Sequence, residues 1–165
     1  MNYRLIPAEA QPDLYRQLFA LYCQDLQTDD PTIANYDPAI LAGENLAADT
    51  DHPYLIYVAE QPAGLVVFMD ESAPVGEDDC HTYLGEIFVL PAFRNHGIAG
   101  SIAETFFDAQ DYDSGLCYIV GSPAEAFWKK LFNKKNYTYT TTKEDEVRNF
   151  IHLSLRNREN GRTHR

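Results

Sequence analysis

Residues 83–107 constrain the fold of this 165-residue chain more than any other stretch, because they join a strand to a helix through a glycine turn. Residues 83–90 form an apolar run typical of a strand, and residues 98–107 carry apolar pairs at helical spacing. The first backbone N–H groups of a helix have no partner within it, and the helix dipole adds about half a positive charge there. Gly97 and Gly100 let a bulky anion approach the backbone, and Arg94 adds a forked cation. The stretch therefore predicts an anion-binding site.

The residues around Gly97 match neither of two common phosphate-binding motifs. The turn lacks the Gly-x-Gly-x-x-Gly pattern of dinucleotide-binding proteins, and no Gly-Lys-Ser/Thr follows it. The pattern Arg94-x-x-Gly97-x-Ala99, preceded by Val89-x-Pro91, instead resembles the pyrophosphate loop with which GNAT N-acetyltransferases bind acyl-coenzyme A. An ordinary strand–turn–helix junction with a surface arginine is the alternative interpretation.

The predicted elements follow one another in the order βααβββαβαββ. Residues 54–59 and 65–69 are expected to form a hairpin around a turn at residues 61–64. This order predicts an α/β fold, an α+β sandwich whose mixed, mostly antiparallel central sheet is flanked by helices. It is also the element order of the GNAT fold, so the resemblance covers nearly the whole chain. The expected strands are residues 3–6, 54–59, 65–69, 83–90, 115–121, 137–142 and 150–155, and the expected helices are residues 13–26, 38–48, 98–107 and about 124–132.

Length and composition predict one domain over residues 1–155, followed by a polar, basic tail at residues 156–165. No apolar run is long enough to span a membrane, and the first residues lack the pattern of a signal peptide. The three cysteines are far apart and the histidines show no ligand spacing, so we expect reduced thiols and no metal. These features favour a cytoplasmic protein that does not bind membranes.

The net charge of −12 is unevenly distributed along the chain. Residues 1–121 contain 20 acidic and 3 basic side chains, whereas residues 122–165 contain 5 acidic and 10 basic ones. The acidic majority argues against nucleic acid as a partner, because nucleic-acid binding depends on neutralising phosphates.

The resemblance implies a bacterial-type N-acetyltransferase that uses acetyl-CoA as co-substrate, without a metal. In the family, the pantetheine arm pairs with the fourth strand and the pyrophosphate with the loop that follows it. An aromatic side chain at the position of Trp128 packs beside the pantetheine in a subgroup with Phe-Trp in place of Phe-Tyr, although Trp128 could equally belong to the core. The implied cofactor-binding residues are Phe88, Val89, Leu90, Arg94, Asn95, His96, Gly97, Ala99, Gly100, Ser101 and Trp128.

Glu86 is the candidate general base, because it is an acid inside an otherwise apolar strand. Desolvation would raise its pKa toward neutral pH, where a base is most useful. The alternatives are a polar edge position or an ion pair. The usual general acid of the family is a tyrosine where this chain has Trp128, and an indole N–H cannot serve as one. Ser122, Tyr118 and Tyr137 are the nearby hydroxyls that could replace it, with Ser122 and Tyr137 as the candidates.

The acceptor is expected to be a primary amine on a small molecule or a peptide. The segments that form the acceptor site in the family are acidic here, which is the basis for expecting a cationic amine. Surface charge that serves only solubility is the alternative interpretation, and it is the simpler one. The departure at Trp128 leaves a second function open, a non-catalytic acyl-CoA sensor or docking protein of the same fold. A homodimer is possible, as in relatives. The acids concerned are Asp25, Asp29, Asp30 and Asp37 in one segment, and Asp70, Glu71, Glu77, Asp78 and Asp79 in the other.

Overall fold

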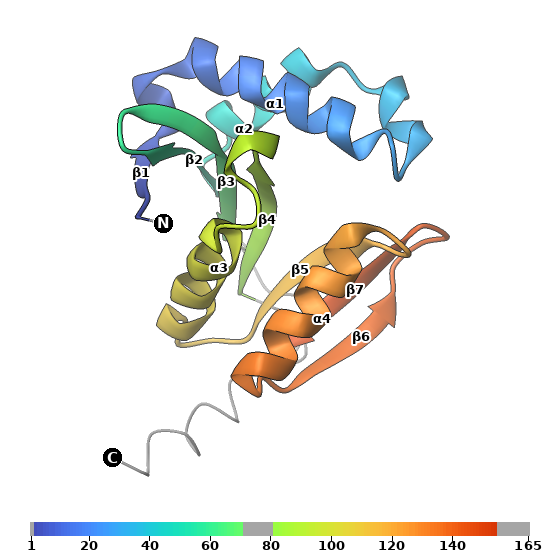
Figure 1. The fold of residues 1–165 in the computed structure, drawn as a ribbon. Helices are drawn as coiled ribbons and strands as arrows, with labels where there is room; N and C mark the ends of the chain where they lie inside the picture. The colour runs from blue at the N-terminus through green and yellow to red at the C-terminus, as the bar shows by residue number, and fades with distance from the viewer. Residues whose placement is uncertain (1, 71–80, 155–165) are drawn as a thin grey trace.

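A computed structural model describes residues 2–70 and 81–154 and shows a seven-stranded sheet flanked by four α-helices (Figure 1). The strand order is β1-β2-β3-β4-β5-β7-β6, and neighbours are antiparallel except for the parallel pair β4 and β5. The predicted fold class and element order are therefore confirmed. The strands are β1 Arg4–Pro7, β2 Asp51–Val58, β3 Gln61–Asp70, β4 Thr82–Val89, β5 Ser114–Ile119, β6 Tyr139–Lys143 and β7 Arg148–Leu153. The α-helices are α1 Pro12–Leu26, α2 Pro38–Ala47, α3 Ile98–Ala109 and α4 Pro123–Lys135, and short 3₁₀ turns occupy Ala8–Ala10, Pro31–Asn35 and Pro91–Phe93.

The helices form two layers, one on each face of the sheet. Helices α1 and α2 cover β2, β3 and β4 with a cluster that includes Tyr15, Phe19, Leu65 and Phe88. Helices α3 and α4 pack against the opposite face. Helix α2 begins as predicted, with Pro38 in its first turn and the Asp37 side chain accepting a hydrogen bond from a backbone N–H.

The hairpin between β2 and β3 turns earlier than the sequence predicts. The turn lies at Ala59 and Glu60, where Ala59 has a φ of 51°, and residues 61–64 already belong to β3. Gly64 is needed inside the strand rather than in a turn, because a Cβ there would lie 2.0 Å from the Phe88 carbonyl oxygen. The Pro-Ala-Gly sequence therefore marks a close strand contact rather than a reversal of the chain.

Strands β4 and β5 are paired over only two residues each. Thr82 lies opposite Ser114 and Tyr83 opposite Gly115, and within the described residues no further pair joins the two strands. Beyond Tyr83, β4 diverges from β5 and its edge opens between the two halves of the sheet (Figure 1). The second half of β4, which contains Glu86 to Val89, is therefore reachable from this edge.

A β-bulge in β4 decides which way its side chains point. Val67 of β3 lies opposite Glu86 and Phe68 lies opposite Leu84, so Gly85 is the extra residue. In a regular strand Leu84 and Glu86 would share a face, because side chains alternate with a period of two. With the bulge, Leu84 packs into the core under α3 and α4, while Glu86 contacts Tyr22 on α1. The bulge thus turns an acid from the α3 face to the α1 face.

Candidate active site

Glu86 lies on the open half of β4 and is partly buried beneath α1. The Tyr22 hydroxyl of α1 donates a hydrogen bond to its Oε2 atom. Burial raises the pKa of Glu86 to about 7, against the lowering effects of the Tyr22 hydrogen bond and the positive charge of Arg148. A carboxyl group with this pKa can take up and release a proton near neutral pH, as a general base must.

Arg148, at the start of β7, connects the surroundings of Glu86 to the segment between α1 and α2. Its guanidinium lies 3.7 Å from Asp30 and 3.6 Å from Asp145. Asp30 is 1 % exposed, and its other carboxylate oxygen accepts from the backbone and the hydroxyl of Thr32. A buried acid thus holds the cation whose positive charge acts on Glu86.

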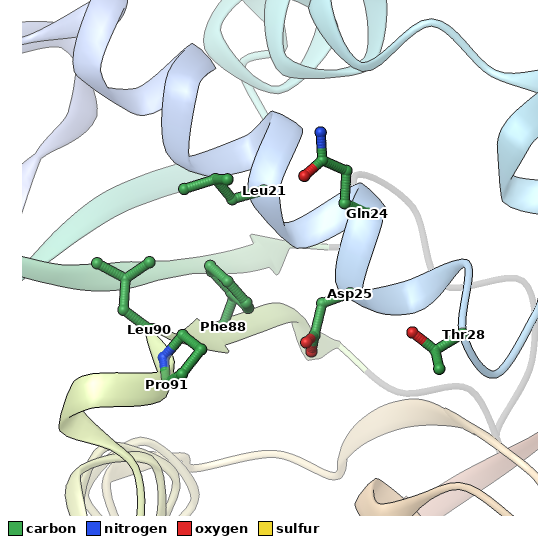
Figure 2. A pocket seen from close by; sticks show the side chains of 7 residues that line it. All are labelled: Leu21, Gln24, Asp25, Thr28, Phe88, Leu90 and Pro91. Atoms are coloured by element: carbon green, nitrogen blue, oxygen red, sulfur yellow. The ribbon is translucent and has the colours of Figure 1, made fainter.

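A shallow pocket of about 330 Å³ lies between α1 and the end of β4, on the face to which Glu86 points. Figure 2 shows that apolar side chains from β4 and its following turn form one wall and that α1 forms the other. The polar groups of the pocket come from α1 and the turn after it. The lining residues are Leu21, Gln24, Asp25, Thr28, Phe88, Leu90 and Pro91.

Arg94 lies beside this pocket rather than above the first turn of α3. Its Nε donates to the Val89 carbonyl at 2.8 Å, and its terminal nitrogen lies 3.1 Å from Asp25. The guanidinium also lies over the Phe88 ring, 5.6 Å from its centroid. Arg94 therefore joins the turn after β4 to the end of α1, and its predicted contact with phosphate stays a prediction.

The first turn of α3 has the features of an anion site. Gly97 is the N-cap with a φ of 77°, and no side chain caps the helix. Asn95 also has a positive φ, of 63°. A Cβ placed on Gly97 or Gly100 would meet no atom within 4 Å, so both glycines border open space. These backbone groups fit a bulky phosphate ligand, because the free N–H groups, the positive end of the helix dipole and the open space beside the glycines lie at the same place.

The remaining predicted cofactor residues lie close to this turn or in the core. Phe88 and Val89 are buried at the end of β4, with Phe88 on the α1 face and Val89 on the α3 face. His96 is exposed, with Nδ1 3.3 Å from the Phe93 carbonyl, and Ser101 is exposed in the first turn of α3. Trp128 is 4 % exposed and stacks on Phe132, so the structure favours the core interpretation of its indole.

The hydroxyl groups of the predicted acid candidates form hydrogen bonds with groups other than Glu86. The Ser122 hydroxyl donates to the Ile119 carbonyl at 2.7 Å. The Tyr137 hydroxyl donates to Asp108, in the last turn of α3. Since the glycine turn is at the other end of that helix, roughly 16 Å of helix separates Asp108 from Gly97. The Tyr118 hydroxyl accepts a hydrogen bond from Asn149.

Four of the five described acids in the predicted acceptor segments already have partners. Asp25 pairs with Arg94, Asp30 with Arg148, and Asp37 caps α2. Asp70 lies 2.7 Å from His52. Asp29 is exposed. Glu71, Glu77, Asp78 and Asp79, like the tail at residues 156–165, lie outside the described residues.

The sequence interpretation missed Tyr22 and Arg148. Tyr22 belongs to the apolar stripe of α1, which by itself indicates only core packing. Arg148 is one of many basic residues near the end of the chain. Neither has a local signal, because their importance comes from contacts with residues far away in the sequence.

Within residues 2–70 and 81–154, no group of three or more histidine, cysteine, aspartate or glutamate side chains is arranged to hold a metal ion. None of the helices in this part of the chain is long and apolar enough to cross a membrane.

Solved structures place this architecture among the acetyltransferases. No family model matches the sequence, and no curated protein matches it. An acetyltransferase from Thermus thermophilus superposes with a TM-score of 0.68 at 15% identity, covering 94% of this chain and 98% of its own. A GNAT-family acetyltransferase from Streptococcus agalactiae gives 0.64 at 13% identity, covering 92% and 95%.

Campylobacter jejuni N-acetyltransferase PseH, solved in complex with acetyl coenzyme A, gives a TM-score of 0.56 at 13% identity, covering 93% of this chain and 99% of its own. Because nearly the whole chain is matched in each case, the protein has the GNAT acetyltransferase fold.

Proposed function

We propose that this protein is an acetyl-CoA-dependent N-acetyltransferase that moves an acetyl group directly to a primary amine. The observation that carries the proposal is the position of Glu86 on the open edge of β4, the strand that leads into the anion site at α3. Three residues of strand, roughly 10 Å, separate Glu86 from Val89. A proton acceptor and a phosphate cradle thus occupy one continuous strand–turn–helix segment, on a fold shared with acetyltransferases.

Each part of the site has a role in the proposed reaction. The first turn of α3 binds the pyrophosphate, and the open edge of β4 offers backbone groups to the pantetheine arm and the thioester carbonyl. Acetyl-CoA supplies the acetyl thioester. Glu86 removes one proton from the acceptor ammonium, and the amine nitrogen bonds to the acetyl carbon. The carbon–sulfur bond then breaks to release coenzyme A thiolate, and the nitrogen loses its second proton to the thiolate or to water. Glu86 then returns its proton to water.

The proposed acceptor is a cationic amine, on a small molecule or a peptide. Asp25 and Asp30 are balanced by their ion pairs with Arg94 and Arg148, so the support for a cationic acceptor comes from the Glu86 carboxyl group. A cationic amine would therefore meet an environment that favours its charge. We also propose a cytoplasmic location, which is consistent with the free thiols of Cys23 and Cys117.

A second candidate function is a non-catalytic acyl-CoA sensor. It is favoured by Trp128, which is buried in the core at the position where the family usually has a tyrosine that acts as general acid. It is also favoured by Ser122 and Tyr137, whose hydroxyls are both bonded elsewhere. The enzyme remains the better supported function because Glu86 has the pKa of a working base, and because coenzyme A thiolate can leave without an acid.

An amine panel separates the two functions. Free thiol is followed with acetyl-CoA and polyamines, lysine peptides, neutral amines and amino acids, while coenzyme A binding is measured separately by calorimetry. Steady thiol release with cationic amines supports the enzyme and its acceptor class. Tight coenzyme A binding without turnover supports the sensor, and better turnover with neutral or anionic amines contradicts the cationic acceptor. Absence of coenzyme A binding contradicts both functions.

A further inference from the structure

Tyr22 and Glu86 meet across the two layers of the protein, although 64 residues separate them in the sequence. The Tyr22 ring is fixed from two sides, with Phe19 at 5.6 Å and Phe88 at 5.7 Å between ring centroids. These contacts leave the phenol little rotational freedom and aim its hydroxyl at the carboxylate. Nothing in apolar packing alone requires a tyrosine here, because a phenylalanine would keep both ring contacts.

We propose that Tyr22 is a positioning residue for Glu86, holding one carboxylate oxygen so that the other is left to accept the proton of the acceptor amine. The proposal rests on the proposed acetyl transfer. The bulge at Gly85 turns Glu86 toward α1, and Tyr22 supplies the donor that stops the side chain there. A carboxylate has lone pairs on both oxygens, so a single donor leaves its acceptor capacity available.

The hydroxyl remains a donor over the working pH range. Burial raises the pKa of Tyr22 well above its ordinary value, and the charge of Glu86 raises it further. Tyr22 therefore stays protonated while Glu86 titrates, and its hydrogen bond stabilises the ionised carboxylate.

The other titratable and charged groups around Glu86 act on it through charge rather than contact. Asp51 opposes its ionisation and Arg148 favours it. Burial raises the pKa of Cys23 to about 11, so that thiol is neutral at the pH where Glu86 titrates. Among the described residues, Tyr22 is thus the side chain whose hydrogen bond can orient the carboxylate as well as lower its pKa. The neighbours are Tyr15, Tyr22 and Cys23 on α1, Asp51 on β2, Cys117 on β5 and Arg148 on β7.

The decisive variant is Tyr22→Phe, which removes the donor and keeps the ring. Tyr57→Phe is the matched control, because the Tyr57 hydroxyl donates to Gln11 at 3.0 Å and lies in the same α1 cluster. The Glu86 carboxyl is titrated by NMR with ¹³C-labelled glutamate, its signal assigned by its loss in Glu86→Gln. We expect Tyr22→Phe to raise the Glu86 pKa by about one unit and Tyr57→Phe to leave it unchanged. An unchanged pKa in Tyr22→Phe overturns the proposal.

Turnover gives a second readout that a merely structural role would not move. With acetyl-CoA and the best amine of the panel, the acidic limb of kcat/KM in Tyr22→Phe should shift to higher pH with the carboxyl pKa. The shift is upward because Tyr22 donates to the ionised carboxylate, and losing that donor raises the Glu86 pKa. Below the new pKa the base is protonated and activity falls, and above it activity returns. A pH-independent loss of activity overturns the positioning role.

Failure of the proposed function gives a different result. If no amine is acetylated by any variant, the enzyme is contradicted, and the carboxyl titration alone decides whether Tyr22 holds Glu86. If Glu86→Gln retains full turnover with an unchanged pH profile, Glu86 is not the base, and Tyr22 then has no base to position.

Discussion

The proposed coenzyme A side and the proposed acceptor side of this molecule are built in different ways. The anion site is one continuous segment, in which β4 leads through Gly97 into α3. The surroundings of Glu86 are assembled from α1, β2, β4 and β7, with Tyr22, Asp51 and Arg148 converging on one carboxyl group. The first site is formed by the backbone of residues that are close in the sequence. The second is formed by side chains that are far apart in the sequence and meet only in the folded protein.

This difference predicts different responses to substitution. A local backbone site loses ligand binding when space or conformation changes, while the base keeps its pKa. A tertiary side-chain site loses reactivity when one partner is removed, while coenzyme A binding continues. Variants that change coenzyme A binding and the reactivity of the base equally would show that the two sites are not independent.

The largest expected effect is on turnover in Glu86→Gln. Removing the proton acceptor should lower kcat/KM by roughly 10²- to 10⁴-fold, the usual contribution of a positioned base. Coenzyme A affinity, measured by calorimetry, should stay within about twofold because the α3 turn is untouched. A loss confined to coenzyme A binding would show that Glu86 serves the cofactor side instead.

The contrast also explains which parts of the site could be predicted from the sequence. Gly97 and Arg94 stand in a short pattern before a periodic helix, and that pattern predicts an anion site because the helix dipole and free N–H groups are local properties. Glu86 stood out as an acid in an apolar strand. Tyr22 could not be found, because its neighbours in the sequence give no sign of Glu86, which lies 64 residues away.

A second expected effect of Glu86→Gln is a gain in stability that depends on pH. Burial raises the pKa of Glu86 from 4.5 to about 7 in the folded protein, so the folded state binds the proton more tightly than the unfolded chain does. Unfolding free energy therefore falls as pH rises from about 4.5 to 7, by at most about 3 kcal/mol because the side chain retains some solvent contact.

Thermal unfolding of wild type and Glu86→Gln checks this second effect. The variant should be more stable at pH 8, where the wild-type carboxylate is ionised, and show little difference at pH 4, where it is protonated. Equal stability at both pH values would mean that burial does not penalise the charge. The acceptor side would then lose one of the features that distinguish it from the cofactor turn.

Filling the α3 cradle should weaken coenzyme A binding without harming the fold. A Cβ at Gly100 meets no atom within 4 Å, so the first carbon added by Gly100→Val lies in open space, and valine also has the better helix propensity. We expect roughly tenfold weaker coenzyme A binding, about 1.4 kcal/mol, and an unchanged Glu86 pKa. Gly43→Val is the matched control, since Gly43 also lies within a helix and faces open space. If the two variants bind coenzyme A with equal affinity, the phosphates do not bind at the first turn of α3.

The fold shows the same limit of sequence interpretation as the site. Element order and most helix bounds were predicted because apolar periodicity and caps such as Asp37-Pro38 are local. The hairpin turn was misplaced because Gly64 is required by the nearby carbonyl of Phe88, a contact between strands. The bulge at Gly85 also escaped prediction, since it is defined only by the register of β4 against β3.

Asp25→Asn should have the smallest effect, and it tests the residue that joins the two sides. Arg94 is held by Asp25 at 3.1 Å and by the Val89 carbonyl at 2.8 Å, and both ion-pair side chains are partly exposed. Such pairs contribute about 0–1 kcal/mol, so releasing Arg94 toward the phosphates should tighten coenzyme A binding by about two- to fivefold at low salt. Asp13→Asn is the control, because it breaks the ion pair with Arg16 at the other end of α1, and it should leave coenzyme A affinity unchanged. Weaker binding in Asp25→Asn would mean that the ion pair preorganises Arg94 for phosphate, and that the two sides cooperate rather than compete for it.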